Sequence, residues 1–506
     1  MKYLVTGKEM KLLDQNTSEK FCVPDTVLME QAAMVFVQKL LSWGRPYHNI
    51  LVVCGTGNNG GDGIAIARLL NQKGIRTAVC FAGERLSSNK SGVSELYRLQ
   101  KKIYLSYHYP VEEELDEQAS YDCVIDAIFG TGLSRMLSDE YRRMIATLNR
   151  MSGHKVSVDI SSGVSSDNGE ILGDAFRAED TITFSFGKLG LYLWPGSEYS
   201  GTVHVVDMGI TVESFLERKP KMATLEATDL ARLPVRNPHS NKGTYGRLLI
   251  IAGSPNMAGA AILAAKAAYR TGCGLVKIVT AEENRIPIQS SVPEVILFTY
   301  GKTVDKKSLI ETLKWADAIV IGPGIGLSPS AEVFVREVLQ NAAVPVLMDA
   351  DALNIIAKEP EILLRPHPEL IVTPHLGEMA RLTQDTVAFL QNNFIQSARD
   401  FAQKYDVICV LKDMHTVTAV PFGMSYLNLS GNCGMATAGS GDVLSGIIGS
   451  LLAQHMGGEL AAPLGVYLHG LAGDAALEKC GSVSLMAGDL CDGIMNVLRN
   501  MNKYMR

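Results

Sequence analysis

Residues 52–63 are Val-Val-Cys-Gly-Thr-Gly-Asn-Asn-Gly-Gly-Asp-Gly, and they connect a strand-like apolar run to a helix that we expect from about Ile64 to Gln72. Glycine permits positive φ and close approach of a ligand, and the N–H groups at a helix start attract anions. Gly55, Gly57 and Gly60 also satisfy the G-x-G-x-x-G pattern of dinucleotide-binding folds. A lone match fits a tight strand-to-helix turn equally well. The segment therefore predicts an α/β fold, but by itself it does not identify a ligand.

The same alternation of short strand-like runs and longer helical runs extends along the chain in both directions from this segment. It predicts α/β layering with parallel strands. No repeat of 20 to 50 residues is present, so a solenoid is disfavoured. Strands are expected at 49–54, 76–81, 121–127, 155–159, 181–184 and 203–206 in the first half, and at 247–252, 275–279, 318–322, 346–350, 369–373 and 407–412 in the second.

The length of 506 residues is too great for a single ordinary core, at roughly 150 residues per domain. Residues 212–232 include a charged, proline-containing stretch that is the best candidate for a linker. We therefore expect an N-terminal domain over 1–215, a linker over 216–230 and a second α/β domain over 231–506.

Composition excludes several classes of protein and partner. The formal net charge is −6, so the basic field that binds nucleic acid non-specifically is absent. No run approaches the ~18 apolar residues of a membrane span. The nine scattered cysteines indicate buried thiols in a reducing cytosol, and neither Cys-x-x-Cys nor His-Glu-x-x-His occurs to suggest zinc. We expect a cytoplasmic protein, a homo-oligomer, that binds small molecules, with no nucleic-acid or membrane partner.

Carboxylates follow two of the expected strands in the first half. Asp126 precedes Phe-Gly-Thr-Gly-Leu and Asp159 precedes Ile-Ser-Ser-Gly. Ligands of open α/β sheets bind beyond the carboxyl ends of the strands, so these side chains and the Asn59 amide could meet in one crevice. A single strand-end aspartate is more often a helix cap. Two of them beside glycine loops favour a site, and its oxygen ligands would suit a hard cation of unspecified identity.

A second glycine-rich loop covers residues 432–446, Asn-Cys-Gly-Met-Ala-Thr-Ala-Gly-Ser-Gly-Asp-Val-Leu-Ser-Gly, and leads into an apolar helix through Ile447 to Leu452. Successive N–H groups at such a helix start form an anion hole that suits a phosphoryl group. Asp442 lies there, where we expect the helix dipole to lower its pKa and keep it ionised. It could accept the proton of a substrate hydroxyl. The alternative is an N-cap aspartate without chemistry, but a cap needs no preceding run of four small residues.

Other polar groups of the second half also follow expected strands. His375 lies in Thr-Pro-His-Leu-Gly-Glu, and Lys412 lies in Leu-Lys-Asp-Met-His-Thr. Each could be a structural residue, His375 in a packed loop and Lys412 on a solvated surface. Their shared position after strands favours a site. No G-x-x-x-x-G-K-[ST] occurs, so a P-loop is excluded.

The motifs of the first half, over roughly residues 1–215, resemble the NAD(P)H-hydrate epimerase family, which usually has proline where this chain has Ser161. The resemblance implies a Rossmann-like three-layer α/β/α domain, and K⁺ held by Asn59, Asp126 and Ser162. It also implies a hydrate site formed by Asn58, Asn59, Gly60, Gly61, Asp62, Gly130, Thr131, Gly132, Leu133, Ser134, Arg135, Met136 and Asp159. Asp159 is our candidate acid/base of that domain.

The motifs of the second half, over roughly residues 225–500, resemble the ribokinase-like NAD(P)H-hydrate dehydratase family, and the fused order resembles the bacterial bifunctional repair enzymes. The resemblance implies ADP as co-substrate and Mg²⁺ as its companion. The hydrate would contact Ala260, Gly324, His375 and the catalytic Asp442. The nucleotide would contact Lys412, Asp413, Met414, His415, Thr416, Asn432, Ala438, Gly439, Ser440 and Gly441.

The expected function is repair of hydrated NADH and NADPH, the substrates NADHX and NADPHX. One half would interconvert the R and S hydrates, and the other would dehydrate the S hydrate with ADP, releasing AMP and phosphate. Two alternatives stay open: the second half could be a vitamin-precursor or sugar kinase, and the first half a non-catalytic dinucleotide-binding module. Separate incubations of the hydrate epimers with ADP would distinguish these functions.

Overall fold

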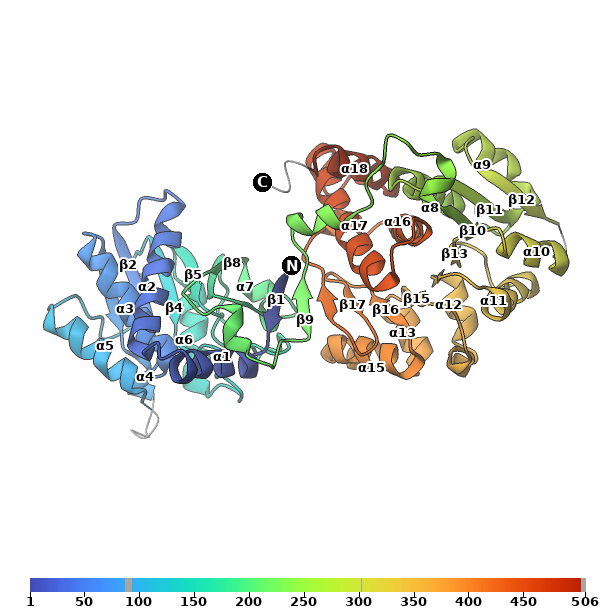
Figure 1. The fold of residues 1–506 in the computed structure, drawn as a ribbon. Coiled ribbons are helices and arrows are strands. Elements are labelled where there is room, and N and C mark those ends of the chain that lie inside the picture. Colours follow the sequence, from blue (N-terminus) through green and yellow to red (C-terminus); the bar gives the residue numbers. More distant parts are fainter. Residues whose placement is uncertain (87–92, 302, 502–506) are drawn as a thin grey trace. The chain divides into compact units, whose positions relative to one another are not determined.

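A computed structural model describes residues 1–86, 93–301 and 303–501. The chain divides into two compact units, one of residues 3–220 and one of residues 1–2 with 221–506 (Figure 1). The division falls within the segment 216–230, and residues 222–224 of that segment form a strand. The expected two-domain α/β fold is confirmed. Each unit is described separately below.

The N-terminal unit contains a six-stranded sheet in the order β3-β2-β4-β5-β6-β8, and every neighbouring pair is parallel. A separate parallel pair joins β1 to β7, with Leu4 opposite Gly187. The strands are β1 (Lys2–Val5), β2 (Asn49–Cys54), β3 (Arg76–Cys80), β4 (Cys123–Ala127), β5 (His154–Val158), β6 (Asp180–Phe184), β7 (Gly187–Lys188) and β8 (Thr202–Val206). The helices are α1 (Gly7–Lys20), α2 (Asp25–Ser42), α3 (Asn58–Gln72), α4 (Ala82–Leu86), α5 (Glu95–Ser106), α6 (Asp139–Arg150) and α7 (Ser197–Ser200), with short 3-10 turns η2 (Leu189–Leu191) and η3 (Val212–Phe215).

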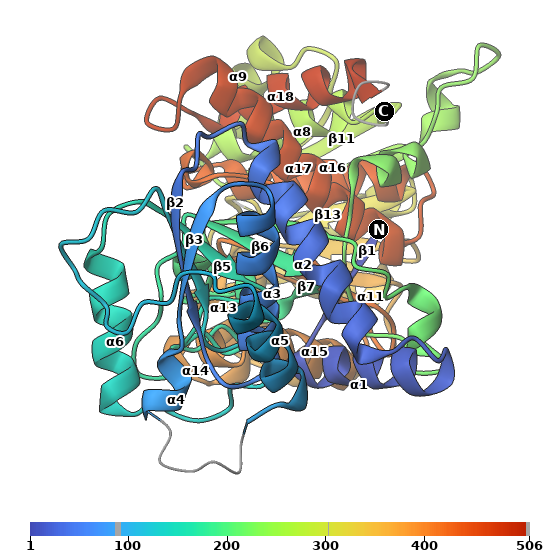
Figure 2. The same cartoon turned by 90° about the vertical axis from the view of Figure 1, so that its left-hand side faces the viewer.

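The central strand β2 shows why this sheet is covered on both faces. Successive side chains of a strand point to opposite faces. Ile50 and Val52 pack into one core with residues of α2 and α3, whereas Leu51 and Val53 pack into a second core with residues of α6. Figure 2 shows α2, α3 and α5 together, apart from α6. This three-layer arrangement puts the carboxyl ends of all six strands at one edge, where their loops are available for a site.

The C-terminal unit contains the strand order β12-β11-β10-β13-β14-β15-β16-β17-β18-β9. Its pairs are parallel from β12 to β16 and antiparallel at β16-β17 and β17-β18. The strands are β9 (Met222–Thr224), β10 (Arg247–Ile251), β11 (Leu275–Ala281), β12 (Ile296–Tyr300), β13 (Ala318–Ile321), β14 (Val346–Met348), β15 (Leu370–Val372), β16 (Ile408–Leu411), β17 (Val417–Ala419) and β18 (Ser425–Leu427).

Four long helices form the main core of this unit against one face of the sheet. Leu248 and Ile250 of β10 point into that core, which includes residues of α8, α16, α17 and α18. The helices are α8 (Ala258–Arg270), α9 (Arg285–Ser291), α10 (Lys306–Leu313), α11 (Pro329–Asn341), α12 (Asp351–Ile356), α13 (Leu376–Thr383), α14 (Val387–Asn392), α15 (Phe394–Tyr405), α16 (Ser440–Ala453), α17 (Gly458–Cys480) and α18 (Ala487–Arg499). The 3-10 turns are η4 (Ala227–Arg232), η5 (Lys242–Tyr245), η6 (Glu282–Asn284), η7 (Pro360–Leu364) and η8 (Cys433–Met435).

The structure differs from the sequence-based expectations in three respects. Helix α3 begins at Asn58, six residues before the expected start at Ile64, because the two N-terminal turns are built from glycine and polar residues that carry little helical signal. Strands β1, β7, β9, β12, β17 and β18 were not expected, and β17 makes the second sheet mixed. Cys22 and Cys433 are exposed, so the expectation of uniformly buried thiols is wrong.

Within residues 1–86, 93–301 and 303–501, no helix combines the length and the apolar character needed to cross a lipid bilayer.

Candidate functional site

A hydrogen-bonded cluster joins the ends of β4 and β5 in the N-terminal unit. The buried Asp126 carboxylate accepts from the Ser162 backbone N–H at 2.7 Å and from the Ser162 hydroxyl at 2.6 Å. Ser162 Oγ in turn accepts from the N–H of Phe129 at 2.8 Å. Burial raises the pKa of Asp126 to about 6, although the Ser162 hydrogen bonds oppose that shift.

Asn59 joins this cluster from the first turn of α3. Its Nδ2 donates to the Phe129 carbonyl at 3.0 Å, and a Cβ placed on Gly130 would lie 3.3 Å from Asn59 Oδ1. The structure thus brings together Asn59, Asp126 and Ser162, the predicted K⁺ ligands. In the part of the chain that the structure describes, no three His, Cys, Asp or Glu side chains gather closely enough to hold a metal ion. Amide, carboxylate, hydroxyl and carbonyl oxygens suit a hard cation, so the donor set fits K⁺.

Two serines stiffen the turn that carries Ser162. The hydroxyl of Ser161 lies 2.9 Å from Ser157 Oγ and donates to the Tyr199 carbonyl at 2.8 Å. Ser161 is fully buried. These bonds fix the turn at the position where the resembling family usually has proline.

Asp159 follows β5 and forms an ion pair with Lys188 of β7. The Lys188 ammonium lies 2.5 Å from Asp159 Oδ1, and the lysine side chain is fully buried. Asp159 has φ +67°, a left-handed conformation that aspartate tolerates better than most residues. Sequence reasoning singled out Asp159 but missed Lys188, because Lys188 lies in a two-residue strand outside every glycine motif.

Two further carboxyls interact electrostatically with this ion pair. Burial raises the pKa of Asp14, on α1, to about 7, against the opposing charge of Lys188. Burial also raises the pKa of Asp62, on α3, well above its usual range, with the charges of Asp159 and Asp14 adding to the shift. Asp62 was among the predicted hydrate-binding residues, whereas Asp14 was missed because nothing in its helix distinguishes it from a surface acid.

The remaining predicted hydrate contacts lie around the same strand ends. Asn58 is exposed and its Oδ1 accepts from Ser94 Oγ at 2.5 Å. Gly60 and Gly61 are buried in α3, and a Cβ on Gly60 would lie 1.9 Å from the Gly55 carbonyl, so this turn requires glycine. After β4 the chain is partly or fully exposed at Thr131, Gly132, Leu133, Ser134, Arg135 and Met136.

In the C-terminal unit, Asp442 lies in the first turn of α16, a helix that begins directly after Gly439, which has φ +91°. The first N–H groups of a helix have no intrahelical acceptor, so this end can bind an anion. The expectation of a lowered Asp442 pKa is wrong. Its pKa is raised to about 7, because burial and the charge of Asp349 outweigh the charge of Lys412.

An ion pair between a buried aspartate and a partly exposed lysine lies beside Asp442. Lys412, directly after β16, donates to Asp349 Oδ1 at 2.8 Å, and Ser445 of α16 donates to Asp349 Oδ2 at 2.8 Å. The pKa of Asp349 is lowered, because the contacts with Lys412 and Ser445 outweigh the cost of its burial. Lys412 is therefore a paired lysine with its side chain 21% exposed. Glu378 also faces this pair, and burial raises its pKa.

The other predicted hydrate contacts occupy two places. His375 is the N-cap of α13: its Nδ1 accepts from the N–H groups of Gly377 and Glu378, and its ring is half exposed. Ala260 and Gly324 lie together, since a Cβ on Gly324 would be 3.1 Å from Ala260 Cβ. Gly324 has φ +59°, so a side chain there would be strained as well as crowded.

Two residues of α17 hold the predicted nucleotide loop. Asp474 accepts from Asn432 Nδ2 and from the Gly431 N–H, each at 3.0 Å. His469 Nε2 lies 3.3 Å from Ser440 Oγ, and burial lowers the His469 pKa to about 4. Sequence reasoning missed both, although they are polar residues within an apolar helix.

Of the other predicted nucleotide contacts, Asp413, Met414 and Ala438 are exposed, and His415, Thr416, Gly439 and Gly441 are partly buried.

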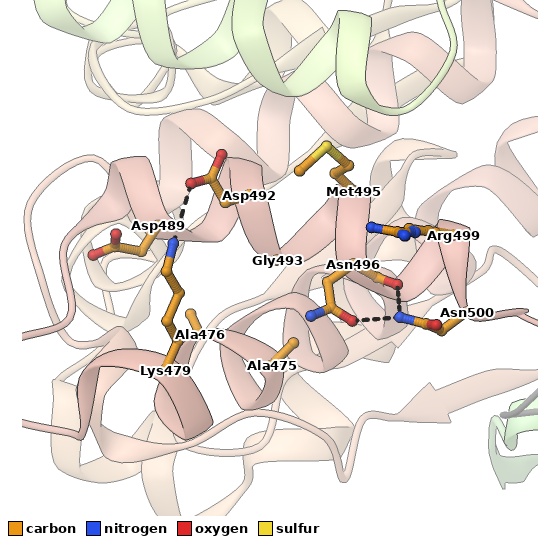
Figure 3. Close-up of a pocket in the computed structure, with 10 residues that line it drawn as sticks. All are labelled: Ala475, Ala476, Lys479, Asp489, Asp492, Gly493, Met495, Asn496, Arg499 and Asn500. Atoms are coloured by element: carbon orange, nitrogen blue, oxygen red, sulfur yellow. Dashed lines mark hydrogen bonds and ion pairs between the residues drawn. The ribbon is translucent and has the colours of Figure 1, made fainter.

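A cavity of about 170 Å³ lies between α17 and α18 (Figure 3). Lys479 and Asp492 approach to 3.7 Å on one side, and Asn500 donates to Asn496 on the other. None of the predicted site residues lines this cavity.

Comparisons with known proteins match both units. The family model described as NAD(P)H-hydrate dehydratase matches residues 248–496, and the one described as YjeF-related protein N-terminus matches residues 25–190. The chain is 36% identical to the bifunctional NAD(P)H-hydrate repair enzyme Nnr of Moorella thermoacetica, over 99% of this chain and 97% of that one.

Among solved structures, a ribokinase-like superfamily protein of Enterococcus faecalis is 28% identical with a TM-score of 0.50, covering 56% of this chain and 96% of that one. An ADP/ATP-dependent NAD(P)H-hydrate dehydratase of Bacillus subtilis, co-crystallized with ATP and Mg²⁺, is 34% identical with a TM-score of 0.48, covering 54% and 96%.

Proposed function

The chain belongs to the family of bifunctional NAD(P)H-hydrate repair enzymes, and we propose that its N-terminal unit interconverts the R and S hydrates while its C-terminal unit dehydrates the S hydrate with ADP. We assign epimerisation to 1–215 and dehydration to 231–506. Cytoplasmic location and a homo-oligomeric state stay predictions.

The position of Asp442 carries the dehydratase proposal. It is a largely buried carboxyl with a pKa of about 7, at the start of α16 and beside the Asp349–Lys412 pair. A general base works best when its pKa lies near the working pH. Asp442 accepts the proton of the hydroxyl on ring carbon 6 as that oxygen attacks the terminal phosphoryl of ADP.

Phosphoryl transfer then makes elimination possible. Hydroxide is a poor leaving group, whereas phosphate leaves readily, and its departure from carbon 6 together with loss of a proton from carbon 5 restores the ring double bond. AMP and phosphate are the by-products. The N–H groups of residues 438–441 stabilise the charge on the transferring phosphoryl, and one such donor can be worth ~3 kcal/mol.

The two proposed metal ions would be held by different ligands. Asn59, Asp126 and Ser162 would hold K⁺, with the Phe129 carbonyl beside them, and this ion would order the loops that bind the hydrate. Mg²⁺ would accompany ADP, held chiefly by the phosphate oxygens as is usual for this ion. It would neutralise phosphate charge near Asp442.

The test is an assay of the purified chain with separated hydrate epimers. We expect ADP to restore NADH absorbance from the S hydrate, and the R hydrate to convert to S without nucleotide. A stable phosphorylated product without recovered absorbance would instead indicate a small-molecule kinase. Unchanged R hydrate would indicate that the N-terminal unit is a binding module. Parallel assays with ATP in place of ADP would establish the nucleotide preference.

A further inference from the structure

Lys188 uses its whole hydrogen-bonding capacity inside the N-terminal unit. Its ammonium donates to Asp159 Oδ1, to Thr183 Oγ1 at 3.0 Å and to the Phe184 carbonyl at 3.0 Å. A lysine has three N–H donors, so none is left for a ligand. Lys188 therefore acts on its neighbours and not on a substrate.

The same contacts make the two oxygens of Asp159 different. Oδ1 accepts from Lys188, from the Thr183 hydroxyl at 3.0 Å and from the Phe184 N–H at 3.3 Å. Among the residues that the structure describes, no donor reaches Oδ2. Asp159 is thus a carboxylate with one saturated oxygen and one oxygen with its lone pairs available.

The charges of the cluster do not balance if every carboxyl is ionised. The charges of Asp159, Asp14 and Lys188 act on Asp62, and the charges of Lys188, Asp159 and Asp25 act on Asp14. One ammonium cannot compensate three carboxylates in a buried site. The raised pKa values of Asp14 and Asp62 favour protons on these two groups, whereas Asp159 is the carboxyl that forms the ion pair with Lys188.

We propose that Asp159 and Asp62 are the acid–base pair of the epimerase, and that Lys188 is a positioning residue that leaves only Oδ2 of Asp159 to take up a proton. This inference rests on the proposed epimerase function. Asp62 is assigned the donor role instead of Asp14 because it lies in the first turns of α3, from which Asn59 reaches the Phe129 carbonyl at the strand ends where Asp159 also lies. Asp14 lies on α1, outside that run.

The pair can invert carbon 6 without any co-reactant. Asp159 takes the hydroxyl proton, the oxygen forms a carbonyl double bond to carbon 6, and the bond from carbon 6 to the ring nitrogen breaks. The electron pair of that bond goes to the nitrogen, which receives the Asp62 proton. Rotation exposes the other face of the aldehyde. The nitrogen then attacks that face, returning its proton to Asp62 while Asp159 reprotonates the oxygen, so the net change is epimerisation.

The decisive experiment compares Asp62→Asn with Asp14→Asn in the full chain. Both variants remove a carboxyl of the same cluster and keep its shape. General acid catalysis contributes ~10²- to 10⁴-fold, so Asp62→Asn should lower the kcat of epimerisation by that range with little change in KM. Asp14→Asn should lower it by less than about tenfold. Equal losses in the two variants, or the larger loss in Asp14→Asn, would overturn the assignment.

Lys188→Met tests the positioning role through a pH profile. Loss of the adjacent positive charge disfavours the ionised carboxylate of Asp159, so the acidic limb of the epimerase profile should move to higher pH. A purely structural role would lower the rate equally at every pH, and that result would contradict the positioning role.

Assays of the wild-type chain distinguish a failure of the proposed function from a failure of the acid–base assignment. If it leaves the R hydrate unchanged, the proposed function fails and this inference with it. If it converts the R hydrate and Asp62→Asn does so at the wild-type rate, only the acid–base assignment fails. In each variant, ADP-dependent dehydration of the S hydrate measures the activity of the other unit and should stay at the wild-type rate.

Discussion

Each unit places an aspartate–lysine pair at its strand ends, but the two lysines are used differently. Lys188 is fully buried, and protein acceptors take all three of its donors. Lys412 is partly exposed, and among the described residues its ammonium makes one hydrogen bond, to Asp349. Two of its donors thus remain available to an incoming group.

The difference follows from the chemistry of each unit. A proton-transfer site needs a fixed charge that does not bind the substrate, and Lys188 supplies it. A phosphoryl-transfer site needs a cation that reaches the phosphate, and Lys412 has donors free for that contact. Its position is held by Asp349, which also accepts from Ser445. The following predictions test this contrast, from the largest expected effect to the smallest.

Asp442→Asn should remove the general base of the C-terminal unit and lower ADP-dependent dehydration by ~10²- to 10⁴-fold. The epimerisation rate should be unchanged, because its acid–base groups lie in the other unit. Both rates can be measured on the same protein with separated hydrate epimers. A parallel loss of both activities would contradict two separate sites.

Lys412→Met tests whether Lys412, unlike Lys188, contacts the phosphate of ADP. It removes a charge-assisted contact worth ~1.5 to 3 kcal/mol, so kcat/KM for ADP should fall by about 10- to 150-fold. Because Lys188 has no donor left for a ligand, Lys188→Met should leave kcat/KM for ADP at the wild-type value. Steady-state kinetics at varied ADP would measure both, and equal effects of the two variants would refute the contrast.

The raised pKa of Asp442 predicts the pH dependence of dehydration. Asp442 acts in its ionised form, and its pKa is about 7, so protonation should reduce the rate as the pH falls through 7. One pH unit below that value, about one tenth of the groups would be ionised, and the rate should drop about tenfold. A profile from pH 5 to 9 measures this limb, with each sample returned to pH 8 to show that the loss is reversible. A flat profile through pH 7 would contradict this environment for Asp442.

Asp474→Asn should give the smallest effect, because Asp474 holds the nucleotide loop without touching the reacting atoms in the proposed site. A net contribution of ~1 kcal/mol from its hydrogen bonds predicts about a fivefold rise in KM for ADP and little change in kcat. A fall in kcat with constant KM would place Asp474 in the chemistry instead. Asp492→Asn, at the cavity between α17 and α18, is a matched control that should alter neither constant.

Much of the site follows from sequence because glycine loops and strand-end carboxylates are local signals. The segments with Asn59, Asp126 and Ser162 were each recognisable, and the structure brings these three side chains together. The start of α3 was misplaced because its glycines have weak helical propensity. The early start puts Asn58–Asp62 on the first turns of a helix.

The protonation states could not be derived from sequence. The position of Asp442 at a helix start correctly suggests a favourable dipole. Its burial and its proximity to Asp349, which is distant in the sequence, arise only when the chain folds. Desolvation of a carboxyl can outweigh a helix dipole, which typically contributes about 0.3 to 1 kcal/mol. The pKa of Asp442 is therefore raised, whereas the sequence predicts that it is lowered.

The sequence by itself determined the family, the two α/β units and the motifs that carry the chemistry, because each of these is encoded in short runs of neighbouring residues. Only the tertiary structure decided which lysine has no donor left for a ligand and which has donors available, and that the charge of Lys188 acts on Asp14 and Asp62. Those properties depend on burial and on contacts between residues far apart in the chain. The electrostatics of a buried group are set by what surrounds it and not by its sequence neighbours.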